Sequence, residues 1–497
     1  ADGTSAAVRE QWPPALWAAV DAACAAVAAT VPPRRCCRVA ICDQMHGVVT
    51  WRVEGGAIEW ANLVTWEDGR LTGAAGSEEL ARMAARSGLV LAPGYGTATL
   101  AAALTAADSG HTGGSMPPAP GWHAASIGAA LACVLAGRPD APTMDVTDAA
   151  SWGGMLRDGS AWDDAALAAL HPRLPAAMPR PIVPTGSALG RLCSASAAAA
   201  GMPNLAALCA PHAAVHTSLG DHPAATLAAL TTPAGAAGSS HMSGGDVVVL
   251  LTLGTSAQVV AVPTMADGGA ALADAAAEAT HGGGGLEVRP TVMLPGATPA
   301  TMLVGAAMNG GNVLAAIAGG VAGLLRGMGG TGSTELEAAY AALESGAAAV
   351  LATTPLMWEG GTPRLGSLAV DARLVPERGA GGGGGDGLCI RGVHQAGGLD
   401  LGGVYAAAAA AMLAGVARLL PAAVWRRVSH VRATGGALHR SATLRALLPA
   451  VLAHVSGRAD LPLLQLDAAA DTPFAGAIGA ALAAFSCASS APLKRND

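Results

Sequence analysis

The fold is decided by a stretch in the middle of the chain, residues 246–263, which has the sequence DVVVLLTLGTSAQVVAVP. Apolar and β-branched residues dominate both 246–253 and 257–263, as expected for two strands. The three small residues between them, Gly254-Thr255-Ser256, predict a β-hairpin with a polar tip. Such a tip leaves backbone N–H groups and hydroxyls open to phosphate oxygens. A hairpin also needs glycine for its geometry alone, so this stretch by itself leaves both interpretations open.

Short apolar strands alternate with helical patterns on both sides of this hairpin, which predicts an α/β fold. Strands are expected at residues 38–42, 48–52, 58–66, 428–432 and 463–466, and helices from 77, over 122–136, 313–326 and 405–420, and from 440 and 475. The stretch 139–184 is expected to be partly irregular. We place the domain boundary near Gly244-Gly245, giving domains 1–245 and 246–490. Two glycine- and alanine-rich segments, 266–285 and 378–387, are interpreted as solvated insertions.

Composition excludes several classes of function. The chain has 497 residues, 52% of them hydrophobic, which is enough for two cored domains. A formal net charge of −7 with only 13% charged residues provides no basic face for nucleic acid. The uncharged, alanine-rich stretch 401–417 is too short and too weakly apolar to predict a membrane span. Nine cysteines without a CxxC pair argue against disulfides or structural zinc and favour a reducing compartment, the cytoplasm.

The single lysine of the chain, Lys494, excludes further mechanisms. A Walker-A loop, a protein-kinase strand lysine and a Schiff base each need an amine within the fold. A GxGxxG match at residues 327–332 follows a predicted helix and not a strand. It therefore predicts a turn between helices and not a dinucleotide site.

An acidic residue stands where an apolar run ends and a helix is expected to begin, at Asp221 in Gly220-Asp221-His222. Capping of the helix explains it. General-base catalysis explains it equally, because a sugar hydroxyl must lose its proton as it attacks phosphorus. The local sequence does not decide between the two.

Three other polar turns are candidate ligand sites. Gln44-Met45-His46-Gly47 precedes the cluster Trp66-Glu67-Asp68-Gly69-Arg70, which supplies a stacking ring, an acceptor and a donor suited to a polyol. Thr434-Gly435-Gly436-Ala437, between a strand and a helix, lets backbone approach a flat base or an anion. Each of these turns is also explained by local structure alone.

The order of these segments is more specific than any one of them. Gln-Met-His-Gly, Thr-Trp-Glu-Asp-Gly-Arg, Gly-Asp, a Gly-Thr-Ser hairpin and Gly-Gly-Ala follow one another as in the FGGY carbohydrate kinases, which the chain resembles from about residue 38 to 485. The segments 148–153 and 308–314 resemble those of sedoheptulokinases more than those of xylulokinases. The resemblance implies two actin-like, ribonuclease-H-like domains with a cleft between them.

The resemblance also implies roles for individual residues. Asp221 would be the catalytic base. The expected sugar contacts are Met45, His46, Trp66, Asp68 and Arg70, with Asn309 and Asn312 as further sugar or nucleotide contacts. The expected ATP contacts are Gly254, Thr255 and Ser256 at the phosphates and Gly435, Gly436 and Ala437 at adenosine, with Gly476 and Gly479 in the last helix nearby. No protein metal ligand is assigned, and Mg²⁺ would arrive with ATP.

The implied reaction is ATP-dependent phosphorylation of a ketose primary hydroxyl, sedoheptulose giving sedoheptulose 7-phosphate. The alternatives are a xylulokinase-like pentulose kinase and a catalytically inactive sugar- or nucleotide-binding protein. The assembly is left open between monomer and homodimer.

Family members begin with an Asp-x-Gly-Thr-Thr phosphate hairpin roughly seventy to eighty residues before Met-His-Gly, whereas Met45 here comes far sooner. Ala1-Asp2-Gly3-Thr4-Ser5 matches that turn only superficially, because no strand precedes it. We therefore expect an incomplete first domain with open sheet edges and with reduced or absent catalysis. An in-frame Asp-x-Gly-Thr segment upstream of Ala1 would restore a complete kinase, whereas its absence would favour the binding-protein alternative. A transit peptide there would place the protein in a plastid.

Overall fold

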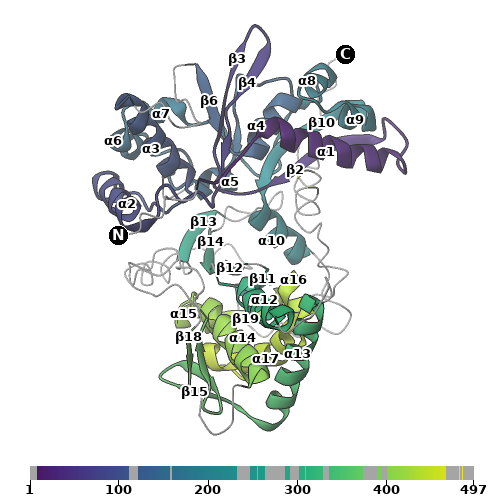
Figure 1. Ribbon diagram of the computed structural model, residues 1–497. Helices are drawn as coiled ribbons and strands as arrows, with labels where there is room; N and C mark the ends of the chain where they lie inside the picture. The colour runs from purple at the N-terminus through teal and green to yellow at the C-terminus, as the bar shows by residue number, and fades with distance from the viewer. Residues whose placement is uncertain are drawn as a thin grey trace. The chain divides into compact units, whose positions relative to one another are not determined.

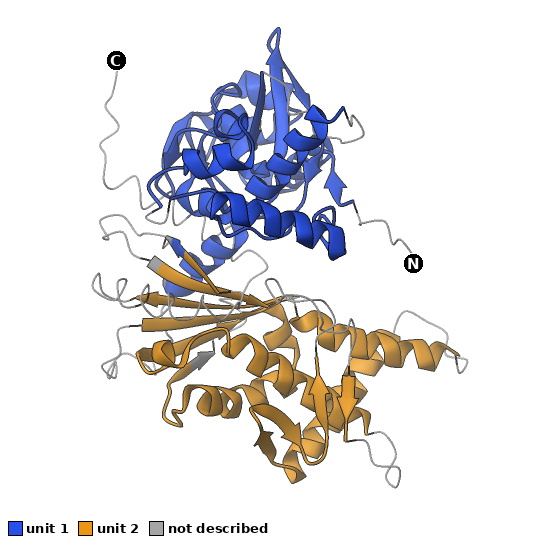
Figure 2. Ribbon diagram, turned by 90° about the vertical axis from the view of Figure 1, so that its left-hand side faces the viewer, with its two compact units in different colours: residues 1–231, 289–299, 473–497 blue, residues 232–288, 300–472 orange. Residues whose placement is uncertain are grey.

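The computed structural model describes two compact units, coloured separately in Figure 2. Unit 1 comprises residues 1–231, 289–299 and 473–497, and unit 2 comprises residues 232–288 and 300–472. The described residues are 8–110, 121–156, 159–231, 247–254, 256–263, 286–290, 301–307, 309–327, 335–372, 389–392 and 400–465, with 272, 481 and 484. The predicted boundary near Gly244-Gly245, the helix from 475, and nearly all of residues 266–285, 327–332 and 378–387 lie outside them.

One sheet of unit 1 has the strand order β2-β10-β9. Strand β10 (Cys209–Gly220) runs parallel to β2 (Cys36–Asp43) and antiparallel to β9 (Ala188–Arg191). Helix α4 (Ile127–Leu135) packs on both β10 and β2. Because β2 and β10 are parallel, their carboxyl ends meet at one edge of the sheet, the edge where open α/β sheets bind ligands.

A second sheet of unit 1, ordered β4-β3-β6, contains the second of the two strands expected at residues 38–42 and 48–52. Both strands form, but β3 (Val49–Glu54) pairs with β4 (Ala57–Trp60) and β6 (Trp122–Ala125), not with β2. The chain turns between them at His46, whose φ is 69°. Strand β4 follows β3 directly along the chain, whereas β6 beside β3 and β10 beside β2 come from distant parts of the sequence.

Several predicted boundaries were wrong, including the helix expected from residue 77, which begins at Gly73, and the helix expected over 405–420, which spans Leu401–Ala417. The strand expected over 58–66 is two strands, because β4 ends at Trp60 and β5 (Leu63–Val64) pairs instead with β1 (Glu10–Gln11). The helix expected over 122–136 begins only at Ile127. Its first four predicted residues pair with β3, and the Ser126 side chain caps the helix by accepting from the Ala129 amide at 3.3 Å.

The other elements of unit 1 surround these sheets (Figure 1). They are α1 (Pro13–Ala28), α2 (Gly73–Ser87), α3 (Gly96–Asp108), β7 (Met144–Asp145), α5 (Val146–Ser151), α6 (Asp164–Leu170), α7 (Leu174–Ala177), β8 (Ile182–Val183), α8 (Ser194–Ala199), α9 (Pro203–Leu208) and α10 (Asp221–Thr231). Residues 139–184 thus hold three short helices and two short strands. The core of the unit includes the fully buried side chains of Trp51 and Trp152.

Unit 2 is built on a sheet ordered β13-β14-β12-β11-β19-β20. Its strands are β11 (Val247–Leu253), β12 (Ala257–Pro263), β13 (Leu286–Pro290), β14 (Thr301–Ala307), β19 (Val428–Thr434) and β20 (Leu463–Gln465). The predicted hairpin is confirmed: β11 and β12 pair antiparallel from Val247↔Pro263 to Leu253↔Ala257. Strand β11 also runs parallel to β19. The last two residues of β13, from Arg289, belong to unit 1.

Helices pack on this sheet, and two small hairpins complete the unit (Figure 1). The helices are α12 (Gly311–Gly327), α13 (Glu335–Thr353), α14 (Leu401–Ala417), α15 (Ala422–Trp425), α16 (Gly436–Arg440) and α17 (Ala442–Ser456); the hairpins are β15 (Leu356–Glu359) with β16 (Thr362–Leu365) and β17 (Ala369–Asp371) with β18 (Cys389–Arg391).

The alanine-rich helix expected over 405–420 is α14, and it is buried along almost its whole length. Small residues permit this burial. A Cβ on Gly402 would lie 2.4 Å from the backbone of Gly346, so only glycine lets α13 and α14 approach so closely. Among the described helices, none combines the length and apolar character that a membrane crossing requires.

Candidate functional site

Two aspartates come together where β2 and β10 end. In the parallel register Gly220 lies opposite Asp43, the last residue of β2, and Asp221 follows at the start of α10. Their proximity is fixed by strand pairing between segments almost 180 residues apart in sequence. This carboxyl edge is the candidate catalytic site of unit 1.

Asp221 is the accessible carboxylate of the pair. It is exposed, and its Oδ1 accepts a hydrogen bond from the His222 amide at 2.9 Å. The surrounding protein nevertheless removes water from the carboxyl group, and this desolvation raises its pKa. Amide hydrogen bonds, including one from Met45, and the charge of Arg289 oppose the rise. The group is therefore a stronger base than a free aspartate and remains open to a ligand.

Asp43 and Asp148 lie behind this edge and are poorly solvated. Asp43 Oδ2 accepts from the Gly128 amide at 2.6 Å, and Asp148, which is 0% exposed, accepts from the Ser126 hydroxyl through Oδ2. The Oδ1 atoms of both aspartates are buried and have no hydrogen-bond partner in the described part of the chain. Gly128 leaves the space for this arrangement, since a Cβ there would lie 2.4 Å from Asp43 Cγ.

Desolvation and mutual repulsion raise the pKa values of these two carboxyls and so favour their protonated forms. Desolvation, followed by the negative charge of Asp148, raises the pKa of Asp43 well above its ordinary value. Desolvation likewise raises the pKa of Asp148 to about 7, with smaller contributions from Asp145 and Asp221 and opposition from Ser126 and Arg289. The raised pKa of each acid lowers the negative charge that it adds next to Asp221.

Met45 and His46, two predicted sugar contacts, are both mostly buried, at 5% and 8% exposure. Met45 packs against Gly220, where a Cβ would lie 2.4 Å from Met45 Cγ, so glycine is needed just before Asp221. His46 Nδ1 is 2.6 Å from the Ser151 carbonyl oxygen, and its ring stacks on that of Tyr95 with centroids 4.9 Å apart. Met45 is thus beside Asp221, while His46 is held firmly within the unit.

The other predicted sugar contacts lie on the turn that follows β5. Trp66 is partly buried, Asp68 is 6% exposed, and the Arg70 side chain is 35% exposed. Val48, two residues after His46, donates to the Val64 carbonyl of β5 at 2.9 Å. A Cβ on Gly47 would lie 3.6 Å from Thr65 Cα, so the 44–47 turn lies beside the start of the 65–70 turn.

Three turns converge in unit 2 around the tip of the β11–β12 hairpin. The Gly311 amide donates to the Gly254 carbonyl at 2.8 Å, and a Cβ on Gly311 would lie 2.9 Å from that of Ala437. Gly435, with φ of 115°, has no room for a side chain because a Cβ would lie 2.3 Å from the Leu253 carbonyl oxygen. The predicted phosphate and adenosine segments are thus neighbours.

The remaining predicted contacts of unit 2 border these turns. Asn309 is buried at 5% exposure and Asn312 accepts from the Gly310 amide at 2.7 Å through Oδ1. Ser256 is partly buried beside Gly254, and Gly436 begins α16. Thr255, Gly476 and Gly479 lie outside the described residues.

The donor set suits a magnesium ion that arrives with phosphates. Within the described ranges, no three His, Cys, Asp or Glu side chains converge closely enough to hold a metal ion. Mg²⁺ ordinarily keeps several waters and takes one or two carboxylates together with substrate phosphates. At this edge Asp221 is exposed and Asp43 is partly buried with a raised pKa, so a magnesium ion here would be held mainly by the substrate phosphates and water.

Sequence reasoning did not assign Asp43, Asp148, Arg289 or Glu10 to a site. A signal existed for Asp43, which ends an apolar strand directly before Gln44-Met45-His46. Nothing local marked Arg289, whose Nη1 lies 3.9 Å from Met45 Sδ across 244 residues of sequence.

No protein-family model and no curated protein matches this chain. Solved structures do match this chain. A xylulose kinase from Rhodospirillum rubrum is 19% identical with a TM-score of 0.64 over 98% of this chain and 85% of that one. A ligand-bound xylulose kinase from Lactobacillus acidophilus is 14% identical with a TM-score of 0.62, over 97% and 82%. The Plasmodium falciparum glycerol kinase with ADP is 13% identical with a TM-score of 0.59, over 97% and 82%. At these identities the likeness shows the fold, which confirms the expected α/β fold with two actin-like domains.

Proposed function

We propose that this chain is an ATP-dependent carbohydrate kinase of the FGGY type that phosphorylates a primary hydroxyl of a ketose. The observation that carries the proposal is Asp221, an exposed carboxylate at the joint carboxyl edge of β2 and β10. Its residue type, accessibility and raised pKa suit a general base. The fold supports the same class, because the similar solved structures are sugar kinases.

In this proposal Asp221 accepts the proton of the attacking sugar hydroxyl. The Met45 and His222 amides orient its carboxylate, so little reorganisation is needed when the hydroxyl arrives. The raised pKa values of Asp43 and Asp148 favour their neutral forms and so limit the negative charge that the incoming phosphates meet. Met45 and the 65–70 turn bind the sugar.

The glycine-rich turns of unit 2 would bind the nucleotide. Gly254 and Ser256 offer backbone groups and a hydroxyl to the phosphates. The absence of a side chain at Gly435 and Gly436 leaves the backbone open to adenosine. Mg²⁺, when bound with ATP, would neutralise charge developing on the transferred phosphoryl group.

A further question is which ketose the kinase phosphorylates. Segments 148–153 and 308–314 favour sedoheptulose, whereas the named structural neighbours include xylulose kinases. We propose sedoheptulose as the preferred acceptor and keep xylulose as the alternative.

The test is release of ADP by the purified chain with ATP, Mg²⁺ and a panel of ketoses and glycerol. The proposal expects ketose-dependent ADP release, with sedoheptulose giving the highest kcat/KM. Preference for xylulose would overturn the choice of acceptor but keep the kinase. Ketose or ATP binding by calorimetry without ADP release would instead support the catalytically inactive binding protein.

A further inference from the structure

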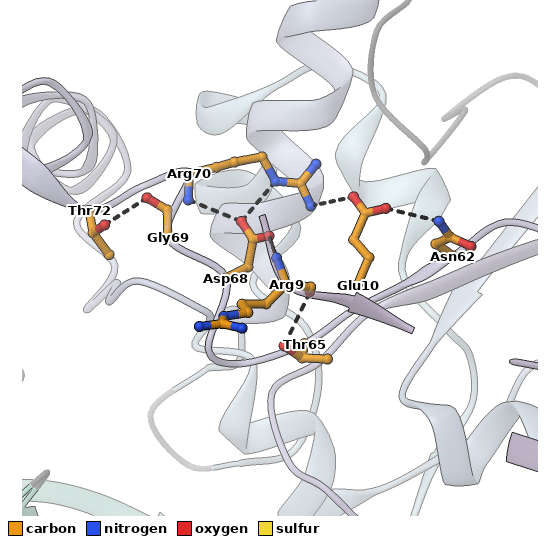
Figure 3. A network of polar contacts seen from close by, with 8 residues as sticks. All are labelled: Arg9, Glu10, Asn62, Thr65, Asp68, Gly69, Arg70 and Thr72. Atoms are coloured by element: carbon orange, nitrogen blue, oxygen red, sulfur yellow. Dashed lines mark hydrogen bonds and ion pairs between the residues drawn. The ribbon is translucent and has the colours of Figure 1, made fainter. Parts of the chain in front are cut away.

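The N-terminal strand β1 lies directly against the proposed sugar site (Figure 3). It is only two residues long and pairs with β5 as Glu10↔Val64 and Gln11↔Leu63. The residue before it, Arg9, accepts hydrogen bonds through its carbonyl from the amide and hydroxyl of Thr65 at 3.0 and 3.2 Å. The start of the strand is thus joined to the start of the 65–70 turn.

The Asp68 side chain stabilises this turn by accepting hydrogen bonds from residues on both sides of it. Its Oδ2 accepts from the Arg9 amide at 2.9 Å, and its Oδ1 accepts from the Arg70 amide and Nε at 3.0 and 2.8 Å. With both oxygens engaged and 6% exposure, this carboxylate is better placed to position Arg70 than to bind a sugar hydroxyl itself. Asp68, predicted as a sugar contact, acts in this arrangement through Arg70.

The Arg70 side chain, which is 35% exposed, reaches solvent from this network. Its Nε is held by Asp68, and its Nη2 lies 3.0 Å from Glu10 Oε1. A guanidinium has five N–H donors in a rigid plane. These two contacts fix the plane and leave the Nη1 donors without a protein acceptor in the described part of the chain. Fixed, partly exposed donors of this kind suit the hydroxyl oxygens of a polyol.

Glu10 is itself held in place. Its Oε2 accepts from Asn62 Nδ2 at 3.0 Å, and its side chain is 13% exposed, so solvent screens the pair with Arg70 only partly. The next residue, Gln11, accepts at Oε1 from Gln44 Nε2 at 3.1 Å. Strand β1 therefore contacts both turns that are proposed to bind the sugar.

We infer that Glu10 is a further positioning residue of the sugar site, which holds the Arg70 guanidinium so that its remaining donors face the ketose hydroxyls. The inference rests on the proposed kinase function. It assigns to the N-terminal strand a role in substrate affinity that no local sequence feature indicates.

The test is steady-state kinetics of Glu10→Gln, which keeps the shape of the side chain and removes its charge. KM for the ketose should rise about tenfold, while kcat and KM for ATP stay within about twofold, because the lost contact orients a binding group. Arg70→Ala should raise the same KM further. The double variant should match Arg70→Ala alone if Glu10 acts through Arg70.

The matched control is Glu59→Gln on β4. Glu59 also pairs with an arginine, Arg52, at 2.6 Å, but it is exposed and has no contact with the 65–70 turn. Thermal unfolding of all variants separates affinity from stability. A ketose KM for Glu10→Gln equal to that of Glu59→Gln, or an additive double variant, would overturn this inference alone. A wild-type chain that neither binds nor phosphorylates any ketose would overturn the kinase proposal and this inference with it.

Discussion

Replacing Asp148 with asparagine should make unit 1 more stable at alkaline pH. Asp148 is 0% exposed, and burial raises the pKa of its carboxyl from 3.8 to about 7. Below about pH 4 the group is protonated in both the folded and the unfolded chain. As pH rises, the unfolded chain loses this proton first, so the stability contributed by the group is lost progressively up to and through pH 7.

The magnitude follows from the difference in pKa. At about 1.4 kcal/mol per tenfold change in proton affinity, a rise from 3.8 to about 7 corresponds to roughly 4 kcal/mol, of which about 2.5 kcal/mol is lost between pH 5 and pH 8. These are upper values, because packing around a charged Asp148 relaxes. Asparagine keeps the acceptor for Ser126 and cannot ionise, so Asp148→Asn should avoid this loss.

The assay is urea unfolding at pH 5 and pH 8, followed by tryptophan fluorescence. Eight of the ten tryptophans lie within residues 1–231, so the signal reports mainly on unit 1. The stability of Asp148→Asn relative to wild type should increase by about 1–2.5 kcal/mol between the two pH values. Asp164→Asn, at an exposed carboxylate, is the control. An equal or smaller advantage at pH 8 than at pH 5 would refute the reasoning.

Two further predictions concern the nucleotide turn and the base. Gly435→Ala should destabilise unit 2 by about 1–3 kcal/mol and weaken ATP binding, because its Cβ would meet the Leu253 carbonyl oxygen at 2.3 Å. Calorimetry and urea unfolding measure the two effects, with Gly319→Ala in α12 as control, since a Cβ there meets no other atom within 4 Å. Unchanged ATP affinity in Gly435→Ala would argue against the turn as a nucleotide site. For the base, desolvation raises the pKa of Asp221 and the base must be ionised, so kcat/KM should fall with decreasing pH with a midpoint above 3.8. A midpoint at or below that value would contradict the assignment.

The parts of the fold that could be predicted are those specified by residues close together in the sequence. The β11–β12 hairpin follows from two apolar runs around Gly254, and α14 follows from its alanine-rich composition. The wrong boundaries lie where tertiary pairing overrides local pattern: Trp122–Ala125 became a strand because β3 offers it backbone partners. No local feature of the sequence indicates that pairing.

The same reason limits what could be predicted of the site. Asp221 and the turn at Met45 were recognised from their local motifs. Asp43 lies near Asp221 because β2 pairs with β10, and Glu10 contacts Arg70 because β1 pairs with β5, in both cases across long stretches of sequence. Asp148 joins the two aspartates because α5 packs on β10. The spacing of residues along the chain does not indicate such proximity.

The most direct test of the account is the turnover of Asp221→Asn, measured as ADP release with a saturating ketose, ATP and Mg²⁺. The account predicts that wild type releases ADP in response to the ketose. It predicts that Asp221→Asn loses about 10²- to 10⁴-fold in kcat, the usual contribution of a general base, with ATP affinity unchanged. Turnover by Asp221→Asn within a few-fold of wild type would contradict the central claim that this carboxylate activates the sugar hydroxyl.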